Sequence, residues 1–133
     1  MAHSRLVGAE VRLSVMAVSE SLRLCRLVAA GLGGEIDLDL DEVEELRVAV
    51  DELCALLVEG DPGGRLELTL RPSRDCIEVE AVVAGGDGGE RLSPVAVHGL
   101  VLTILKATVD DHQLVADEGR RWFRLSKSRR ARP

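Results

Sequence analysis

The adjacent acids Asp51 and Glu52 are the residues of this sequence with the clearest capacity for chemistry. They lie near the middle of DEVEELRVAVDELCALLVE, residues 41–59, whose apolar positions recur at helical spacing and make Glu52 a buried-looking acid. A carboxylate in a partly dry site has few competing partners, so it can serve as a general base or a magnesium ligand. An acid on an amphipathic helix is more often solvated or ion-paired, so the pattern alone leaves both interpretations open.

The other residue types that carry chemistry lack a recognised arrangement. His98 and His112 have no Cys, Asp or Glu at a metal-ligand spacing, so the sequence predicts no metal site. The Ser and Cys residues show no nucleophile elbow or triad context. The glycine-rich run at 84–89 could cradle a phosphate through backbone amides, but it has neither the Lys-Ser/Thr ending of a P-loop nor the GxGxxG spacing.

Composition predicts a cytoplasmic protein without a membrane segment. The N-terminus lacks the charged-then-apolar layout of a secretory signal, and no apolar run reaches the roughly 18 residues that a membrane-spanning helix needs. The cysteines are odd in number, far apart in sequence and set in apolar segments, which favours buried, reduced thiols over disulfides or zinc ligands. They are Cys25, Cys54 and Cys76.

Charge is distributed unevenly along the chain. The formal net charge is −6, but all residues from Arg120 onward that carry a charge are basic, so residues 1–119 hold 10 basic against 23 acidic side chains. Such an acidic body repels nucleic acid and favours a basic protein partner. The basic tail RLSKSRRARP has no interleaved aromatic residue, which favours a solvated terminus over direct nucleic-acid binding.

Hydropathy periodicity predicts five strands and three helices. Alternating apolar residues mark strands at 10–17, 65–72, 75–83, 112–118 and 120–127. The helices are expected from a cap at Ser19 to the glycine run at 31–34, over 41–59 behind a cap at Asp39 or Asp41, and from Ser93 and Pro94 to about Val109.

This order of elements, with strands in hairpins and helices grouped, predicts an α/β fold. We expect a two-layer sandwich in which a mostly antiparallel sheet is covered on one face by three helices. A single domain is expected over residues 1–127, followed by a basic C-terminal tail at 128–133.

Residues 46–60, LRVAVDELCALLVEG, with the two strands, the glycine-rich loop and the helix HGLVLTIL that follow, resemble the RsbW-like anti-sigma factor and serine-protein kinase family. The resemblance spans about residues 10–127 and implies the GHKL, histidine-kinase-like ATPase fold. The first motif of the family is a Glu followed four residues later by an Asn, in which the carboxylate activates the reaction and the amide holds magnesium. Glu52 matches the acid, whereas Leu56 occupies the Asn position.

Two further motifs of the family are also altered. The family reads adenine through the aspartate of an Asp-x-Gly-x-Gly motif, and the alignment places Val83 at that aspartate, Gly85 at the first glycine and Asp87 at the second. The motif that opens the last helix survives in part, from Gly99. Valine cannot accept the adenine hydrogen bond, which costs about 1–3 kcal/mol in a buried site, and leucine cannot coordinate magnesium. The resemblance therefore implies a vestigial nucleotide site and no bound cofactor.

The resemblance implies an anti-sigma factor that sequesters an RNA-polymerase sigma factor and is released by an anti-anti-sigma factor, in a partner-switching pathway. It also implies a homodimer. In the family the first helix forms much of the partner surface. The corresponding residues here are Glu20, Arg23, Leu24, Arg26 and Leu27.

Two alternatives stay open. The chain could be an active ATP-dependent serine-protein kinase that phosphorylates an anti-anti-sigma factor and binds Mg-ATP with Glu52, Asp87 and Gly89 in a shifted frame. It could also be a non-enzymatic adaptor in another partner-switching pathway. Nucleotide binding separates the first alternative from the leading hypothesis, and the identity of the partner separates the second.

Overall fold

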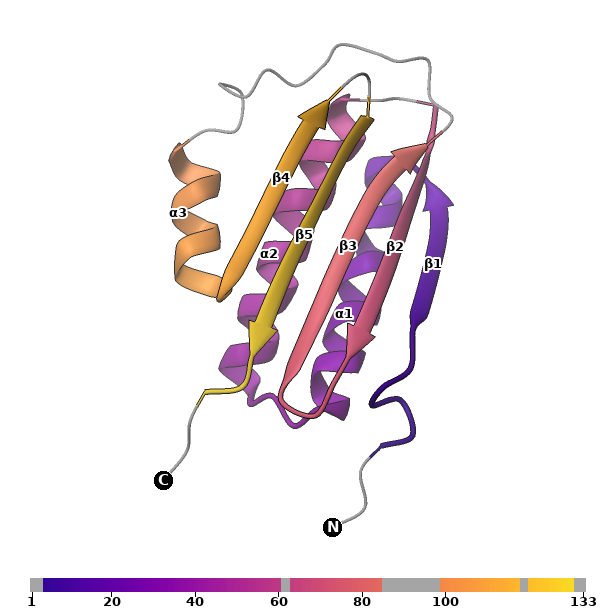
Figure 1. Ribbon diagram of the computed structural model, residues 1–133. Helices are drawn as coiled ribbons and strands as arrows, with labels where there is room; N and C mark the ends of the chain where they lie inside the picture. Colours follow the sequence, from indigo (N-terminus) through magenta and orange to yellow (C-terminus); the bar gives the residue numbers. More distant parts are fainter. Residues whose placement is uncertain (1–3, 61–62, 85–98, 118–119, 131–133) are drawn as a thin grey trace.

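The computed structural model describes residues 4–60, 63–84, 99–117 and 120–130 of the chain. Within these ranges the strands are β1 (Val11–Met16), β2 (Arg65–Pro72), β3 (Cys76–Ala84), β4 (Asp111–Asp117) and β5 (Arg120–Ser128). The helices are α1 (Leu22–Glu35), α2 (Leu40–Gly60) and α3 (Gly99–Thr108), and a short 3₁₀ turn, η1 (Ser19–Ser21), precedes α1. Figure 1 shows α1 and α2 behind the strands and α3 at the β4 edge, which confirms the predicted α/β sandwich.

The sheet has the strand order β1-β2-β3-β5-β4, and every neighbouring pair is antiparallel. One row of paired residues crosses all five strands. It runs through Leu13, Leu68, Ala81, Phe123 and Leu114. Because side chains alternate between the two faces of a sheet, this row places one apolar stripe of every strand against the helices. The alternation in the sequence therefore predicted the buried face correctly.

The core lies between that face and the helices α1 and α2. The buried positions of α2 follow the expected helical period from Leu46 to Leu57. Opposite them, the three leucines of β2 are buried as predicted, and so are Ile77, Val79 and Ala81 of β3. Phe123, the only phenylalanine, is fully buried on β5 in the same cluster.

The start of α1 differs from the prediction. The sequence predicts a helix cap at Ser19, but the hydroxyl of Ser19 instead donates a hydrogen bond to the Glu20 carboxylate at 2.9 Å. The α-helix begins at Leu22 after η1, and Ser21, the residue at its N-cap position, makes no side-chain capping bond. Serine is also common in 3₁₀ turns and often bonds to neighbouring residues. The position of Ser19 before an apolar helix therefore did not show whether it caps that helix.

The end of α1 also differs from the prediction. The glycine run at 31–34 was expected to end the helix by supplying positive φ, but α1 continues to Glu35 and the positive φ, 61°, belongs to Asp37. The Leu38 amide donates to the Gly33 carbonyl at 3.1 Å and the Asp37 amide to the Gly34 carbonyl at 3.2 Å, the pair of bonds of a Schellman cap. The glycines are therefore helical residues, each about 1 kcal/mol less favourable than alanine.

α2 begins with a reciprocal cap. The Glu42 amide donates to Asp39 Oδ1 at 2.7 Å, and the Asp39 amide donates to Glu42 Oε1 at 2.9 Å. This selects Asp39 over Asp41 as the cap. The other carboxylate oxygen of Glu42 accepts a bond from the Arg130 amide at 2.5 Å, and the Glu42 side chain is fully buried.

The C-terminal segment is held against α2 and α3. Lys127, expected in a solvated basic tail, is only 4% exposed. Its ammonium donates to the Thr108 carbonyl at 2.6 Å and lies 3.3 Å from Glu45 Oε1. Arg130 pairs with the same Glu45. The expectation of a solvated terminus is thus wrong at Lys127, because an α3 carbonyl and an α2 carboxylate compensate its burial.

Glu42→Ala should lower the free energy of unfolding by about 2–4 kcal/mol, because it leaves two backbone amides without their acceptor in a dry site. Urea denaturation followed by circular dichroism measures the change. Glu44→Ala is the matched control: this exposed acid one turn into α2 pairs only with Arg47 among described residues, and its loss should cost about 0.5 kcal/mol or less. Equal effects of the two substitutions would contradict the assigned role of Glu42.

Candidate functional site

The structure places four of the six residues expected around the vestigial nucleotide site. Glu52 and Leu56 lie one turn apart on α2, Val83 is near the end of β3, and Gly99 opens α3. Gly85 and Asp87 lie outside the described residues, as does Gly89 of the shifted frame. Glu52 is half-buried, so the prediction of a buried acid at this position is wrong. The fully buried acid of α2 is Glu42, and its two carboxylate oxygens are occupied by backbone amides.

The two apolar replacements in this site belong to the core. Val83 is 5% exposed and pairs with Leu66 across β2 and β3, and Leu56 packs against the same cluster. Neither side chain offers a polar atom to an adenine or a metal ion. Among the described residues, no group of three or more His, Cys, Asp and Glu side chains is placed to hold a metal ion.

The residues expected to bind a partner fall mostly on one exposed face of α1. Leu24 is 47% exposed and Leu27 is 62% exposed, so the two leucines leave apolar surface open to solvent on α1. Glu20 and Arg23 are exposed beside them. The hydrogen bond from the Ser19 hydroxyl lowers the pKa of Glu20, so this acid stays ionised at neutral pH. Arg23, Leu24 and Leu27 lie at helical spacing on one face of α1, whereas Glu20 belongs to the preceding η1 turn.

Arg26 has a different environment. Its guanidinium lies 2.6 Å from Asp51 Oδ1 on α2, and about a third of each side chain is exposed. This ion pair bridges the two long helices at the edge of their contact. Arg26 therefore borders the exposed face of α1 and at the same time fixes α1 to α2.

The pair Cys25 and Cys54 lies beneath this ion pair, in the contact between α1 and α2. Both thiols are free and fully buried. A hydrogen bond with Cys25, together with burial, raises the pKa of Cys54 well above its ordinary value, so Cys54 remains a protonated thiol. The third cysteine, Cys76, is half-buried on β3, which corrects the expectation that all three are buried.

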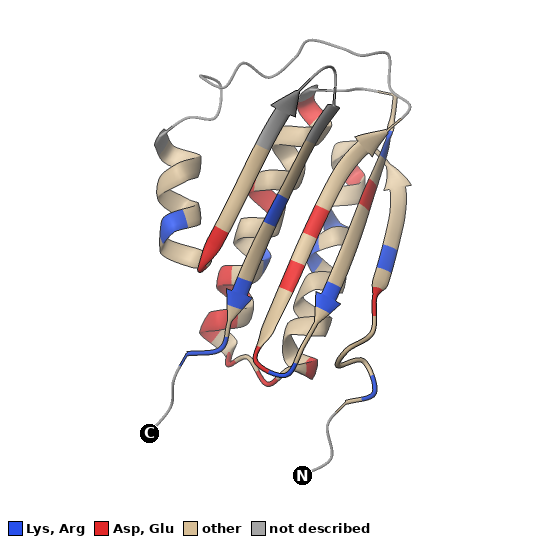
Figure 2. Cartoon of the chain, viewed as in Figure 1, with Lys and Arg blue, Asp and Glu red and all other residues tan. Residues whose placement is uncertain are grey.

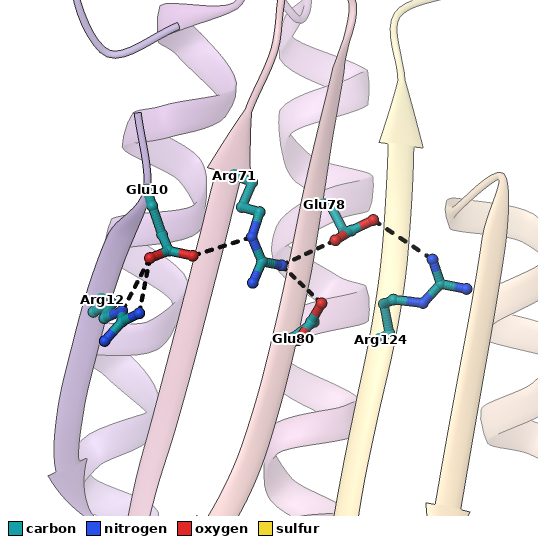
Figure 3. Close-up of polar contacts among 6 residues, drawn as sticks. All are labelled: Glu10, Arg12, Arg71, Glu78, Glu80 and Arg124. Carbon is teal, nitrogen blue, oxygen red and sulfur yellow. Dashed lines mark hydrogen bonds and ion pairs between the residues drawn. The ribbon is translucent and has the colours of Figure 1, made fainter. Parts of the chain in front are cut away.

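The face of the sheet turned away from the helices carries a network of charges that the sequence analysis did not single out (Figures 2 and 3). Arg71 on β2 lies 2.7 Å from Glu80, 3.0 Å from Glu78 and 3.2 Å from Glu10. Arg124 on β5 lies 3.5 Å from Glu78. The alternate charged residues of RLELTLRP and CIEVEAVVA were the available signal, because cross-strand neighbours of opposite charge pair on one face.

A shallow hollow of about 370 Å³ lies beside this network on the same face of the sheet. It contains the only tryptophan of the chain, Trp122 on β5, next to the apolar Val82. The acids that line the hollow are Glu67 and Glu80, and Glu80 is already bonded to Arg71. The hollow is therefore an open depression beside the charge network.

Comparison with known proteins gives relatives that carry the name RsbW. No family model matches the sequence. Over 108 residues, 80% of the chain, it is 38% identical to the anti-sigma-F factor RsbW of Mycobacterium tuberculosis, and the chain spans 62% of the length of that protein. It is 23% identical over 125 residues to the serine-protein kinase RsbW of Halalkalibacterium halodurans, with 82% of the chain and 77% of that protein covered. It is 24% identical over 127 residues to the serine-protein kinase RsbW of Bacillus anthracis, with 83% and 79% covered.

None of the helices in the described ranges is both long and apolar enough to cross a bilayer.

The Arg26–Asp51 pair should show a coupling energy of about 0.5–1 kcal/mol in a double-mutant cycle built from Arg26→Ala and Asp51→Ala, because both side chains are largely shielded from solvent. Urea denaturation of the four proteins measures it. The Arg129–Asp75 pair is the control, since its carboxylate is 63% exposed and a smaller coupling is expected. A coupling of zero at Arg26–Asp51 would contradict the bridging role.

Proposed function

Because this chain belongs to the RsbW-like family, we propose that it is a cytoplasmic anti-sigma factor that sequesters an RNA-polymerase sigma factor in a partner-switching pathway. An anti-anti-sigma factor releases the sigma factor by competing for the chain. The observation that carries the proposal is the 38% identity, over 80% of the chain, to a protein named as an anti-sigma factor. The partners and the cellular location belong to the proposal.

The exposed face of α1 supports this function. Leu24 and Leu27 offer apolar surface that no described residue covers, and Arg23 and Glu20 border it. Desolvating two exposed leucines supplies affinity for a protein partner. The acidic body of residues 1–119 favours encounter with a basic partner and contributes to the association rate more than to the affinity.

We propose further that the chain acts without ATP. Leu56 and Val83 fill the positions at which the resemblance implies a magnesium ligand and the adenine acceptor, and both contact the apolar core. Glu52 keeps a carboxylate, but an acid without its metal ligand has no means of positioning a triphosphate. The protein would then control its partner by binding alone.

The test of sequestration is a binding panel with each purified sigma factor of the source organism, followed by transcription assays with any that bind. The wild-type chain should bind at least one and inhibit it. A panel in which none binds or is inhibited would falsify the proposal, and capture of a different regulator would favour the adaptor alternative. Sedimentation of the free chain shows whether it forms the homodimer that the resemblance implies.

The double substitution Leu24→Asp and Leu27→Asp should weaken binding of that sigma factor on the order of tenfold or more, because two charges replace the apolar centre of the surface. Isothermal calorimetry measures the affinity, and circular dichroism confirms that the variant folds. Leu40→Asp is the control, since Leu40 is an exposed leucine, 88% accessible, on α2 and not on α1. Equal losses for both variants would show that α1 has no special role.

Titration with Mg-ATP should give no saturable heat with the wild-type chain, because the site presents Leu56 and Val83 where oxygen ligands are needed. The serine-protein kinase RsbW of Halalkalibacterium halodurans serves as the control protein in the same buffer. Micromolar binding accompanied by phosphate transfer to a partner serine would instead establish the kinase alternative, with Glu52, Asp87 and Gly89 as its site.

A further inference from the structure

Cys25 on α1 and Cys54 on α2 are two free thiols in one buried contact. Neither side chain has exposed surface, and both belong to the hydrophobic core. The hydrogen bond between the two thiols places their sulfur atoms next to each other. Neither the partner surface on α1 nor the vestigial nucleotide site uses these thiols.

Contacts elsewhere between α1 and α2 fix the register of the two helices. Gly33 faces Leu46, because an added Cβ at Gly33 would lie 3.4 Å from Leu46 Cδ2. Nearer the start of α1, the Arg26 guanidinium lies 2.6 Å from Asp51 Oδ1. Positions that advance along α1 therefore face positions that go back along α2, so the two helices are antiparallel.

This register brings Cys25 and Cys54 face to face independently of their hydrogen bond. Cys25 lies eight residues before Gly33 on α1, and Cys54 lies eight residues after Leu46 on α2. Both steps are slightly more than two helical turns, so they lead along the same line of contact. The facing positions on α1 are small, with the buried Ala29 midway, and small residues let two helices pack closely. Close packing is what a disulfide requires, since its two Cα atoms lie about 4.4–6.8 Å apart.

Cys76 lies too far from this pair to compete for either thiol. It opens β3 next to the β2–β3 hairpin, where Pro72 pairs with Ile77. α1 begins near the other end of the sheet, after Met16 of β1, which pairs with Arg65 at the start of β2. Figure 1 shows the hairpin and the start of α1 at opposite ends of the sheet. Cys76 is therefore an isolated thiol on the same chain.

Cys25 is the more reactive thiol of the pair. The hydrogen bond from the Cys54 thiol lowers the pKa of Cys25, although burial opposes this shift. The thiolate is the form that attacks a peroxide, so Cys25 attacks first and Cys54 keeps its proton until the second step. A peroxide reaches Cys25 when α1 opens locally, and three glycines lower the intrinsic stability of this helix. They are Gly31, Gly33 and Gly34.

We propose that Cys25 and Cys54 are a thiol pair that hydrogen peroxide oxidises to a disulfide, which ties α1 to α2. The Cys25 thiolate attacks one oxygen of the peroxide, the O–O bond breaks, and the other oxygen leaves as hydroxide and takes up the proton that Cys25 had released. Cys25 is then a sulfenic acid. The Cys54 sulfur attacks the Cys25 sulfur, the S–O bond breaks, and the leaving hydroxide takes the Cys54 proton. Two thiols thus give two electrons to one peroxide, which becomes two water molecules.

The disulfide closes the α1–α2 hairpin at the end away from its connection. α1 ends at Glu35 and α2 begins at Leu40, so the chain already joins the helices at that end. A bond between Cys25 and Cys54 encloses this connection and removes conformational freedom mainly from the unfolded chain. The start of α1 is then held as well, and local opening of the helix is suppressed.

Peptide mapping of the reduced full-length chain after treatment with hydrogen peroxide tests the proposal. In native buffer an intramolecular disulfide should join Cys25 to Cys54, and a thiol reductant should reverse it. The same bond should form in Cys76→Ser, the control variant that lacks the isolated thiol. Recovery of Cys25 and Cys54 as free thiols would overturn the proposal. So would a bond that forms only in enough urea to unfold the chain.

Single substitutions separate the roles of the two thiols. Cys54→Ala should leave a sulfenic acid on Cys25 that dimedone traps, because no second thiol is present to displace it. Cys25→Ala should leave Cys54 unoxidised, because burial keeps this thiol protonated. Circular dichroism confirms that each variant folds. A dimedone adduct on Cys54 and none on Cys25 would contradict the assignment of Cys25 as the attacking thiol.

Hydrogen exchange measures the tie between α1 and α2. Amides of α1 should exchange more slowly in the oxidised wild-type chain than in the reduced chain, and the melting temperature should rise by roughly 5–10 °C. Cys76→Ser should show both shifts and Cys54→Ala neither. A disulfide that forms without slowing exchange in α1 would refute the tie. None of these measurements uses a sigma factor, so their outcome is independent of the proposed function.

Discussion

The structure depends on the buried carboxylate of Glu42. One oxygen caps the first turn of α2 through the Asp39 amide, and the other receives the Arg130 amide from the residues after β5. A helix start and the end of the last strand are thereby joined by one side chain with no exposed surface. Beside it, Lys127 ties the same strand to the last turn of α3 and to Glu45. Because α1 packs beside α2 on the covered face of the sheet, the position of α2 helps to determine which face of α1 reaches solvent.

Features that depend on the local sequence pattern could be predicted, whereas features that depend on contacts between residues far apart in the sequence could not. The strands could be predicted from the alternation of apolar and polar residues, since a shift of the strand register by one residue would move every apolar side chain to the wrong face of the sheet. The row of paired apolar residues from Leu13 to Leu114 reflects this alternation. The burial of Glu42 could not be predicted, because its second partner lies 88 positions away and is a backbone group. The end of α1 was missed for a related reason: a glycine permits positive φ but does not impose it, and here Asp37 adopts it.

The same contrast between local pattern and distant contact applies to the candidate site. Helical spacing placed Leu24 and Leu27 on one exposed face of α1, but it could not show that Arg26 is engaged by Asp51 from another helix. Glu52 was expected to be buried because apolar residues surround it in sequence. It is half-buried because buried positions on α2 occupy the opposite side of the helix. A helical period shows which residues share a face of the helix. Whether that face is buried depends on the elements that pack against it.

The free face of the sheet and the exposed side of α1 differ in the free energy that a partner must spend to desolvate them. On the free face of the sheet, Arg71 and Arg124 are already bonded to carboxylates, and a partner would have to desolvate these pairs or replace them. On α1, Leu24 and Leu27 offer exposed apolar surface, whose burial carries no comparable penalty. The Arg26–Asp51 pair stands beside these leucines, so a partner that reaches Arg26 competes with α2 for the same guanidinium. A partner bound on α1, as proposed above, is therefore linked through this ion pair to the helix that also carries Glu52 and Leu56.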